Sequence, residues 1–158
     1  MNSRDAARRK RRLTVGIKES MRALSIQLSL LNHQVGLRAK LKDADLDCLD
    51  LIARCGPLSP TELSRRAGLH PATVTGVLDR LERDRWVTRE RDPEDRRAVR
   101  VRVLRERGAE LLALYAGMNR SMDDICAGYT EAELELLAGF LGRVAEAGGR
   151  ATDDLAAG

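Results

Sequence analysis

Aromatic residues are scarce in this chain, which has one tryptophan, two tyrosines and one phenylalanine among its 158 residues. We therefore expect an aliphatic core and a mostly helical fold. No run of about 18 apolar residues is present, so no segment is expected to span a membrane. The basic N-terminus also lacks the apolar stretch of a secretory signal. The length is typical of one compact domain, and these absences favour a cytoplasmic protein.

Patterns that support catalysis or metal binding are missing too. The sequence has no glycine-rich phosphate loop and no nucleophile elbow. No cluster of His, Cys, Asp or Glu has the spacing of metal ligands. We therefore expect that the protein is not an enzyme and that it has no metal site or cofactor.

Three cysteines, Cys48, Cys55 and Cys126, are an odd number without a paired framework, which agrees with a reducing compartment. We favour the interpretation that they are small buried hydrophobic residues. The alternative is a thiol-based redox sensor, which needs an exposed thiolate of low pKa. Arg54 is the only flanking cation that could lower a thiol pKa in this way.

The net charge of +4 hides an uneven distribution along the chain. Residues 1–60 carry 12 basic and 6 acidic side chains, and residues 61–107 carry 13 and 9, whereas residues 108–158 carry 3 and 9. A basic first two thirds is typical of a protein with one face for a polyanion. A solvated charged surface would produce the same distribution.

Apolar residues then recur every three or four positions, which predicts one face of a long first helix. The members of this stripe are Leu13, Ile17, Met21, Leu24, Leu28, Leu31 and Val35. Gly36 is expected to end the helix or to lie just beyond its end. The basic residues 1–12 are either an unstructured arm that follows phosphates or a solubilising end. Asp43 is expected to cap a second helix that ends near Arg54, with Leu46, Leu49 and Ile52 facing inward.

Two short helices joined by a tight turn follow, a pattern typical of a helix-turn-helix. Ser59, Pro60 and Glu62 form a capping box for the first, and Gly68 ends it. His70 caps the second, in which the buried face is expected to be Val74, Val77, Leu78 and Leu81. Its free face carries small and hydroxyl-bearing side chains with arginine further along, which suits the major groove of DNA.

The segment RERDPEDRRAVRVRV, residues 89–103, contains six arginines and four acids. It predicts a β-hairpin with strands at 86–91 and 98–103, in which Val99, Val101 and Val103 face the core and Arg100 and Arg102 face outward. A hairpin directly after a recognition helix is the wing of a winged helix. Its arginines can contact phosphates or a narrow minor groove.

Two C-terminal helices are expected, one from about Arg105 to Asp124 and one from Thr130, where Glu133 completes a second capping box. Their apolar residues cover more than one face, and so small a domain has little interior to bury them. We therefore expect the terminal helices to form a symmetric dimer.

The segment GPLSPTELSRRAGLHPATVTGVLDRLERDRWVTRERDPEDRRAVRVRV closely resembles the core of the MarR family of winged-helix transcription regulators. The motifs HPATVTGVLDRLE and DPEDRR in register carry the resemblance. It covers nearly the whole chain past the basic arm and implies a homodimeric, cytoplasmic repressor that binds a pseudo-palindromic operator in double-stranded DNA. The implied division is a basic arm (1–12), a dimerisation helix and linker (13–42), the winged module (43–104) and dimerisation helices (105–158).

The resemblance also implies which side chains contact DNA. Those in or beside the major groove would be His70, Ala72, Thr73, Thr75, Gly76 and Arg80. Ser59, Thr61 and Arg65 would contact phosphates before the recognition helix. Arg96 and Arg97 would lie on the wing, with Asp95 orienting them.

Relatives bind small aromatic acids in a crevice beside the dimerisation helices, so His33 is a candidate for binding a small aromatic or phenolic ligand. A dimer-interface or partly exposed histidine is the more frequent alternative. Two positions depart from the family pattern. Arg85 stands where a small residue is common, and Arg105 stands where a threonine usually caps the next helix.

A protein of another class would use the same module differently. The arginine-rich wing could bind an acidic protein partner, and such a protein would show negligible preference for any DNA sequence. A DNA-binding regulator would keep a large ratio of specific to non-specific affinity.

Overall fold

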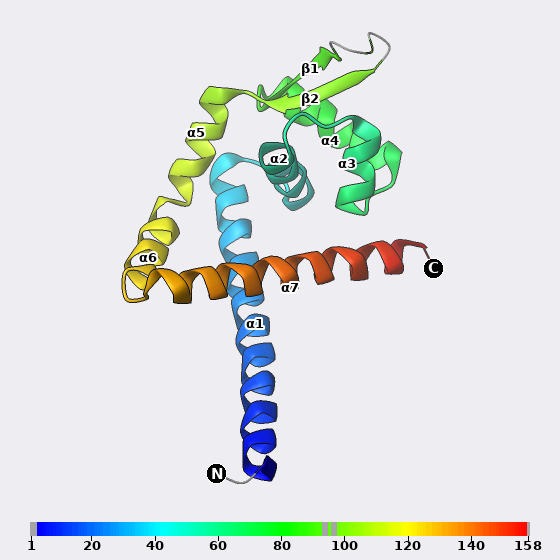
Figure 1. Ribbon diagram of the computed structural model, residues 1–158. Coiled ribbons are helices and arrows are strands. Elements are labelled where there is room, and N and C mark those ends of the chain that lie inside the picture. Colours follow the sequence, from blue (N-terminus) through cyan, green and yellow to red (C-terminus); the bar gives the residue numbers. More distant parts are fainter. Residues whose placement is uncertain (1–2, 93–94, 96–97, 158) are drawn as a thin grey trace. The chain divides into compact units, whose positions relative to one another are not determined.

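The computed structural model describes residues 3–92, 95 and 98–157 (Figure 1). The fold is mainly α-helical with one small antiparallel sheet, which confirms the predicted class. Its elements are α1 (Ser3–Ala39), α2 (Asp43–Cys55), α3 (Pro60–Ala67), α4 (Pro71–Arg83), β1 (Val87–Arg91), β2 (Val99–Val103), α5 (Arg105–Leu114), α6 (Ala116–Cys126) and α7 (Glu131–Ala157). The chain forms two units, Met1–Asp43 and Ala44–Gly158, which are described separately.

Helix α1 begins at Ser3, so the described part of the basic stretch is helical and an unstructured arm is excluded there. This stretch consists mostly of Ala, Arg and Lys, which favour helix, and it contains neither Gly nor Pro. The prediction that Gly36 ends the helix is wrong. Lys40 adopts a left-handed backbone (φ 57°), and the Leu41 N–H donates to Gly36 O at 2.8 Å, which closes a Schellman motif beyond Ala39.

Helix α2 extends to Cys55, one residue past the predicted end. Asp43 is its first helical residue rather than a cap before it. The predicted inward face is confirmed, since Leu46, Leu49 and Ile52 are buried.

The helix-turn-helix is confirmed together with the residues that bound it. Ser59 and Glu62 form the capping box of α3, and Gly68 ends that helix in a left-handed conformation (φ 63°). His70 is the N-cap of α4. The four apolar residues predicted for its inner face are all buried: Val74, Val77, Leu78 and Leu81.

The wing is a two-stranded ribbon in which Val87 pairs with Val103 and Arg91 pairs with Val99. Val101 is fully buried, and its backbone also exchanges hydrogen bonds with Leu58 just before α3. Val99 was expected to face the core but is 38% exposed, because it lies at the end of the ribbon farthest from the buried residues around Val101. Each strand begins one residue later than predicted.

The helix predicted from Arg105 to Asp124 is in fact two helices. Tyr115 separates α5 from α6, and its N–H donates to Leu112 O at 3.1 Å, three residues earlier, in a tighter turn than an α-helix allows. Helix α7 starts at Glu131, and the predicted Thr130–Glu133 capping box is present at its N-terminus. No helix in the described part of the chain is both long and apolar enough to cross a membrane.

Candidate nucleic-acid interface

The N-terminal half of α4 presents small side chains to solvent. The His70 Nδ1 accepts the Ala72 N–H at 3.3 Å, which fixes the start of the helix. Ala72, Thr73 and Thr75 are exposed, and the Thr75 hydroxyl donates to Pro71 O at 3.0 Å. Gly76 is half-buried. A partner can therefore approach this face of α4 closely and meet hydroxyl groups there.

Arg80 has a different position from the one expected of a groove-contacting arginine. Its Nε lies 3.0 Å from Asp45 Oδ2 and its second nitrogen 2.5 Å from Oδ1, so the pair is bidentate. Asp45 is buried on α2, and its hydrogen bonds raise the pKa of Arg80. The structure thus uses Arg80 to attach the recognition helix α4 to α2.

Helix α3 presents a second set of predicted contact residues. The Ser59 hydroxyl donates to Glu62 Oε2 at 2.8 Å and accepts the Glu62 N–H at 3.2 Å, so it is already engaged in the cap. Thr61 and Arg65 are exposed. Of these three side chains, Thr61 and Arg65 are the ones with room to contact a phosphate.

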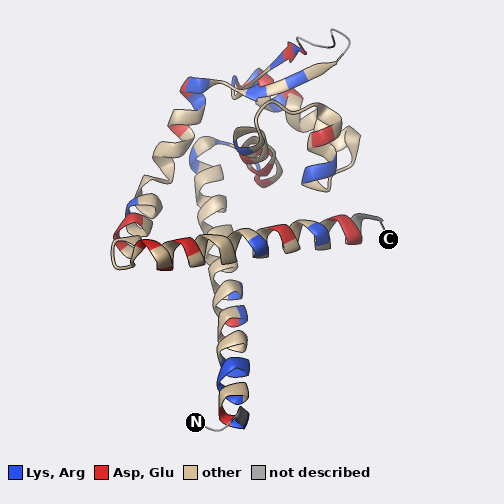
Figure 2. Ribbon diagram, in the orientation of Figure 1, with Lys and Arg blue, Asp and Glu red and all other residues tan. Residues whose placement is uncertain are grey.

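Most arginines described in the wing form ion pairs within the protein. Arg89 donates to Asp79 at 2.6 Å and to Glu82 at 2.8 Å, which joins β1 to α4. Figure 2 shows basic and acidic positions side by side along this ribbon. The wing arginines therefore serve partly to hold the wing on the helix-turn-helix.

The second strand is attached in the same way. Arg100 donates to Glu62 on α3 at 3.0 Å and to Asp92 at 2.7 Å. Arg102 donates to Glu90 on the neighbouring strand at 2.7 Å. Arg100, which was expected to face outward into solvent, instead lies partly buried between two carboxylates.

A pair between Asp92 and an arginine was expected from the sequence, but the pairs of Arg89 with α4, of Arg100 with Glu62 and of Arg102 with Glu90 were not. The cross-strand register would have suggested Glu90 as a neighbour of Arg100 and Arg102. Nothing in the local sequence indicates that Glu62 lies beside a residue 38 positions later.

The tip of the wing is described only in part. Arg96 and Arg97, the predicted DNA contacts, lie outside the described residues. Asp95 is exposed, and its N–H donates to Asp92 Oδ1 at 3.3 Å. Its predicted role in orienting Arg96 or Arg97 stays a prediction.

The three thiols differ in their surroundings. Cys48 is fully buried, and desolvation together with Asp47 and Asp45 raises its pKa to about 11, so it is protonated at neutral pH. Cys55 is exposed, and Arg66 donates to its Sγ at 3.6 Å. Cys126 is half-buried. The buried-hydrophobe interpretation therefore fits Cys48, and the redox activity of the other two stays an open alternative.

His33 lies on the surface of α1, with Nδ1 3.2 Å from Asp43 Oδ1. Its side chain is 53% exposed, so it is not enclosed within the unit Met1–Asp43, and its ligand role stays a prediction. Within residues 3–92, 95 and 98–157, no group of three or more His, Cys, Asp or Glu side chains could hold a metal ion.

The sequence pattern of the MarR family matches residues 41–99, which span α2, the helix-turn-helix and most of the wing. YcgE of Bacillus subtilis, described as an uncharacterised HTH-type transcriptional regulator, is 37% identical over 119 residues, or 75% of this chain and 77% of YcgE. The chain belongs to the MarR family. YetL of the same organism, described as an HTH-type transcriptional repressor, is 34% identical over 56% of this chain and 53% of YetL.

Solved structures agree with this assignment. The transcriptional regulator Tm0710 from Thermotoga maritima has a TM-score of 0.61 and 26% identity, over 85% of this chain and 95% of its own. A MarR family protein from Bacillus stearothermophilus shares the fold with a TM-score of 0.64 at 20% identity, over 92% of this chain and 96% of its own. This MarR-family protein is thus a transcription regulator with a DNA-binding winged helix, and not an enzyme.

Proposed function

We propose that this MarR-family regulator is a cytoplasmic homodimer that represses transcription by binding a pseudo-palindromic operator in double-stranded DNA. The exposed small and hydroxyl-bearing face at the start of α4 carries this proposal. Small side chains allow the helix backbone to enter the major groove, and the Thr73 hydroxyl can donate to or accept from a base edge. The name given to YetL, a repressor, supports the direction of regulation.

The remaining contacts position the protein rather than select a sequence. Thr61 and Arg65 on α3 would contact backbone phosphates, and Arg96 and Arg97 would extend the contact along the wing. Arg80 would act by holding α4 in place and Arg100 by holding the wing in place. Recognition helices of the two subunits would enter successive major grooves about 34 Å apart.

The dimer proposal rests on apolar residues that a single copy leaves exposed. On α1 these are Leu13, Val15, Ile17, Leu24, Ile26, Leu28, Leu30 and Leu37. On α6 and α7 they include Met122, Ile125, Leu136, Leu137, Phe140 and Leu141. A soluble monomer seldom exposes so many large apolar side chains, so a second copy would cover them. A small aromatic or phenolic ligand near His33 would release the dimer from DNA by changing the spacing of the two winged modules.

In-vitro selection of the purified full chain against random duplex DNA at about 150 mM salt tests this function. The expected product is a palindrome with half-sites about one helical turn, or 34 Å, apart. Recovery of no motif, with binding that vanishes at that salt, would contradict sequence-specific recognition and favour an acidic protein partner.

A further inference from the structure

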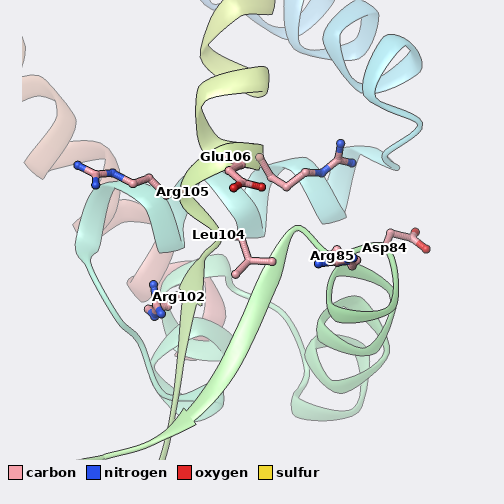
Figure 3. Close-up of a pocket in the computed structure, with 7 residues that line it drawn as sticks. Asp84, Arg85, Arg102, Leu104, Arg105 and Glu106 are labelled. Carbon is pink, nitrogen blue, oxygen red and sulfur yellow. The ribbon is translucent and has the colours of Figure 1, made fainter.

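A surface depression of about 650 Å³ lies at the base of the wing (Figure 3). Its lining comes from the end of α4, from β2 and from the first turn of α5. We call it the wing-base depression, and its lining residues are Asp84, Arg85, Arg102, Leu104, Arg105, Glu106 and Arg107. It does not include any residue of the α4 face proposed to read DNA bases.

Positive charge predominates in the wing-base depression, with four arginines against two carboxylates. Arg102 pairs with Glu90, and Arg107 pairs with Glu110. The Asp84 carboxylate is engaged on both oxygens by Arg83, at 2.9 and 3.1 Å. Neither Arg85 nor Arg105 has a carboxylate partner among the residues that the structure describes.

The backbone adds to the positive electrostatic potential of the depression. Helix α5 begins at Arg105, and its N-cap is Leu104, whose apolar side chain makes no capping hydrogen bond. The first amide N–H groups of a helix have no intrahelical acceptor and carry a partial positive charge. Arg85 and Arg105 are the two positions that depart from the family pattern. Both line this depression, which is rich in hydrogen-bond donors.

We propose that the wing-base depression binds an oxyanion, a phosphate or carboxylate group, through Arg85 and Arg105. Figure 3 shows Arg102 and Arg105 on one side of Leu104 and Arg85 on the other, and all four residues line the same depression. Guanidinium groups suit such a ligand because they donate in pairs to carboxylate and phosphate oxygens. Glu106 opposes binding, since its carboxylate is in the same lining.

Two residues of the depression contact Trp86, whose fluorescence can report anion binding. The Arg107 guanidinium stacks 3.7 Å from the centre of the Trp86 ring, and the Leu104 N–H donates to Trp86 O at 2.9 Å. Trp86 is buried and is the only tryptophan of the chain. An anion bound beside Arg107 would compete with the Trp86 ring for this guanidinium, so we expect anion binding to change the fluorescence of Trp86.

The test is a titration of the full chain with inorganic phosphate at constant ionic strength, balanced with chloride, monitored by Trp86 fluorescence and by calorimetry. The wild-type protein should bind saturably. The double variant Arg85→Gln, Arg105→Gln should bind about tenfold more weakly or not at all. Arg120→Gln on α6 removes one charge outside the depression and should bind like the wild type, while Glu106→Gln should bind more tightly.

A response that does not saturate, or that is equal in the wild type and in the double variant, would overturn the proposal. Circular dichroism shows whether the double variant is folded, and the Glu106→Gln comparison keeps the test valid if it is not. A tighter Glu106→Gln variant supports the oxyanion site, and an unchanged one contradicts it.

Binding to a DNA duplex then identifies the source of the oxyanion. If a backbone phosphate occupies the depression, the double variant loses DNA affinity and its salt dependence falls by about one unit per lost contact. If a diffusible anion occupies it, DNA affinity in phosphate-free buffer is unchanged, and added phosphate alters the DNA affinity of the wild type only. The phosphate titration itself does not depend on the proposed operator binding.

Discussion

Arg85 and Lys40 adopt a left-handed backbone, with φ of 59° and 57°, where a side chain is unfavourable. Both lie at the C′ position of a Schellman motif, the left-handed residue just beyond the C-cap of a helix. After α4, the Arg85 N–H donates to Glu82 O at 3.0 Å and the Trp86 N–H to Leu81 O at 2.8 Å. The buried pair of Trp86 and Leu81 completes the motif.

Replacing Arg85 by glycine should therefore stabilise the protein. Arg85→Gly removes the steric cost of the left-handed backbone, and we expect the free energy of unfolding to rise by about 1 kcal/mol. Urea denaturation measures this change. The control Ala53→Gly, at an exposed position within α2, should lower the same free energy by about 1 kcal/mol. A destabilised Arg85→Gly protein would show that the arginine side chain outweighs its backbone strain.

The Arg80–Asp45 pair allows a second prediction at this scale. Arg80→Met leaves the buried Asp45 carboxylate without its counterion, and we expect a loss of about 3 kcal/mol in the free energy of unfolding. Combining it with Asp45→Leu removes the unpaired charge and should recover most of that loss. A double variant less stable than Arg80→Met would contradict this explanation.

At the scale of elements, the wing is attached to the helix-turn-helix by two arginines and by one backbone bridge. Arg89 joins β1 to α4, Arg100 joins β2 to α3, and Leu58 exchanges backbone hydrogen bonds with Val101. Glu62 belongs to both structures, since it caps α3 and accepts from Arg100. Its pKa is lowered below the ordinary 4.5, first by the hydrogen bond from the Ser59 N–H and second by the Ser59 hydroxyl.

This lowered pKa predicts a pH-dependent effect of Glu62→Gln. A carboxylate with a depressed pKa stabilises the folded state above about pH 4.5, and that contribution is lost as the pH falls through the folded pKa. Glutamine can still cap α3 but does not titrate. The melting temperature of the wild type should exceed that of Glu62→Gln at pH 7, and the difference should shrink below pH 4. A difference that is constant with pH would show that the charge of Glu62 contributes nothing.

The sequence predicted elements where the signal is local. Both ends of α3 and the start of α4 were predicted correctly, from Ser59, Gly68 and His70. Capping depends on residues within one turn, so the local sequence indicates it. The C-terminal end of α1 was missed because Lys40, rather than a glycine, adopts the left-handed conformation. The break at Tyr115 was missed because no proline marks it.

Among the candidate site residues, the exposed face of α4 could be predicted from helical periodicity alone. The roles of Arg80 and Arg100 could not. Their carboxylate partners lie 35 and 38 residues away in sequence, and only the packing of helices and strands brings them together.

At the scale of the whole molecule, no described residue after Leu111 is buried, and α6 and α7 carry exposed apolar side chains. Leu136 is 73% exposed and Leu141 is 51% exposed. Such faces are costly in water and predict that the protein is dimeric at working concentrations.

Leu136→Glu should therefore weaken self-association while leaving the helical content unchanged. Introducing a charge into an apolar interface costs several kcal/mol of association, so we expect monomers at micromolar concentration by sedimentation velocity. Glu135→Lys, a charge change at the adjacent position, is the matched control and should remain dimeric. A wild-type protein that sediments as a monomer would remove the dimer from the proposed function.

Base reading by α4 can be tested by in-vitro selection of duplex DNA with Thr73→Ala beside the wild type. We expect both proteins to select half-sites with the same spacing. Thr73→Ala should lose base preference at one symmetric pair of positions, at a cost of about 1–3 kcal/mol per contact. An identical motif from both proteins would contradict base reading by the exposed face of α4, and would assign this side chain to the DNA backbone.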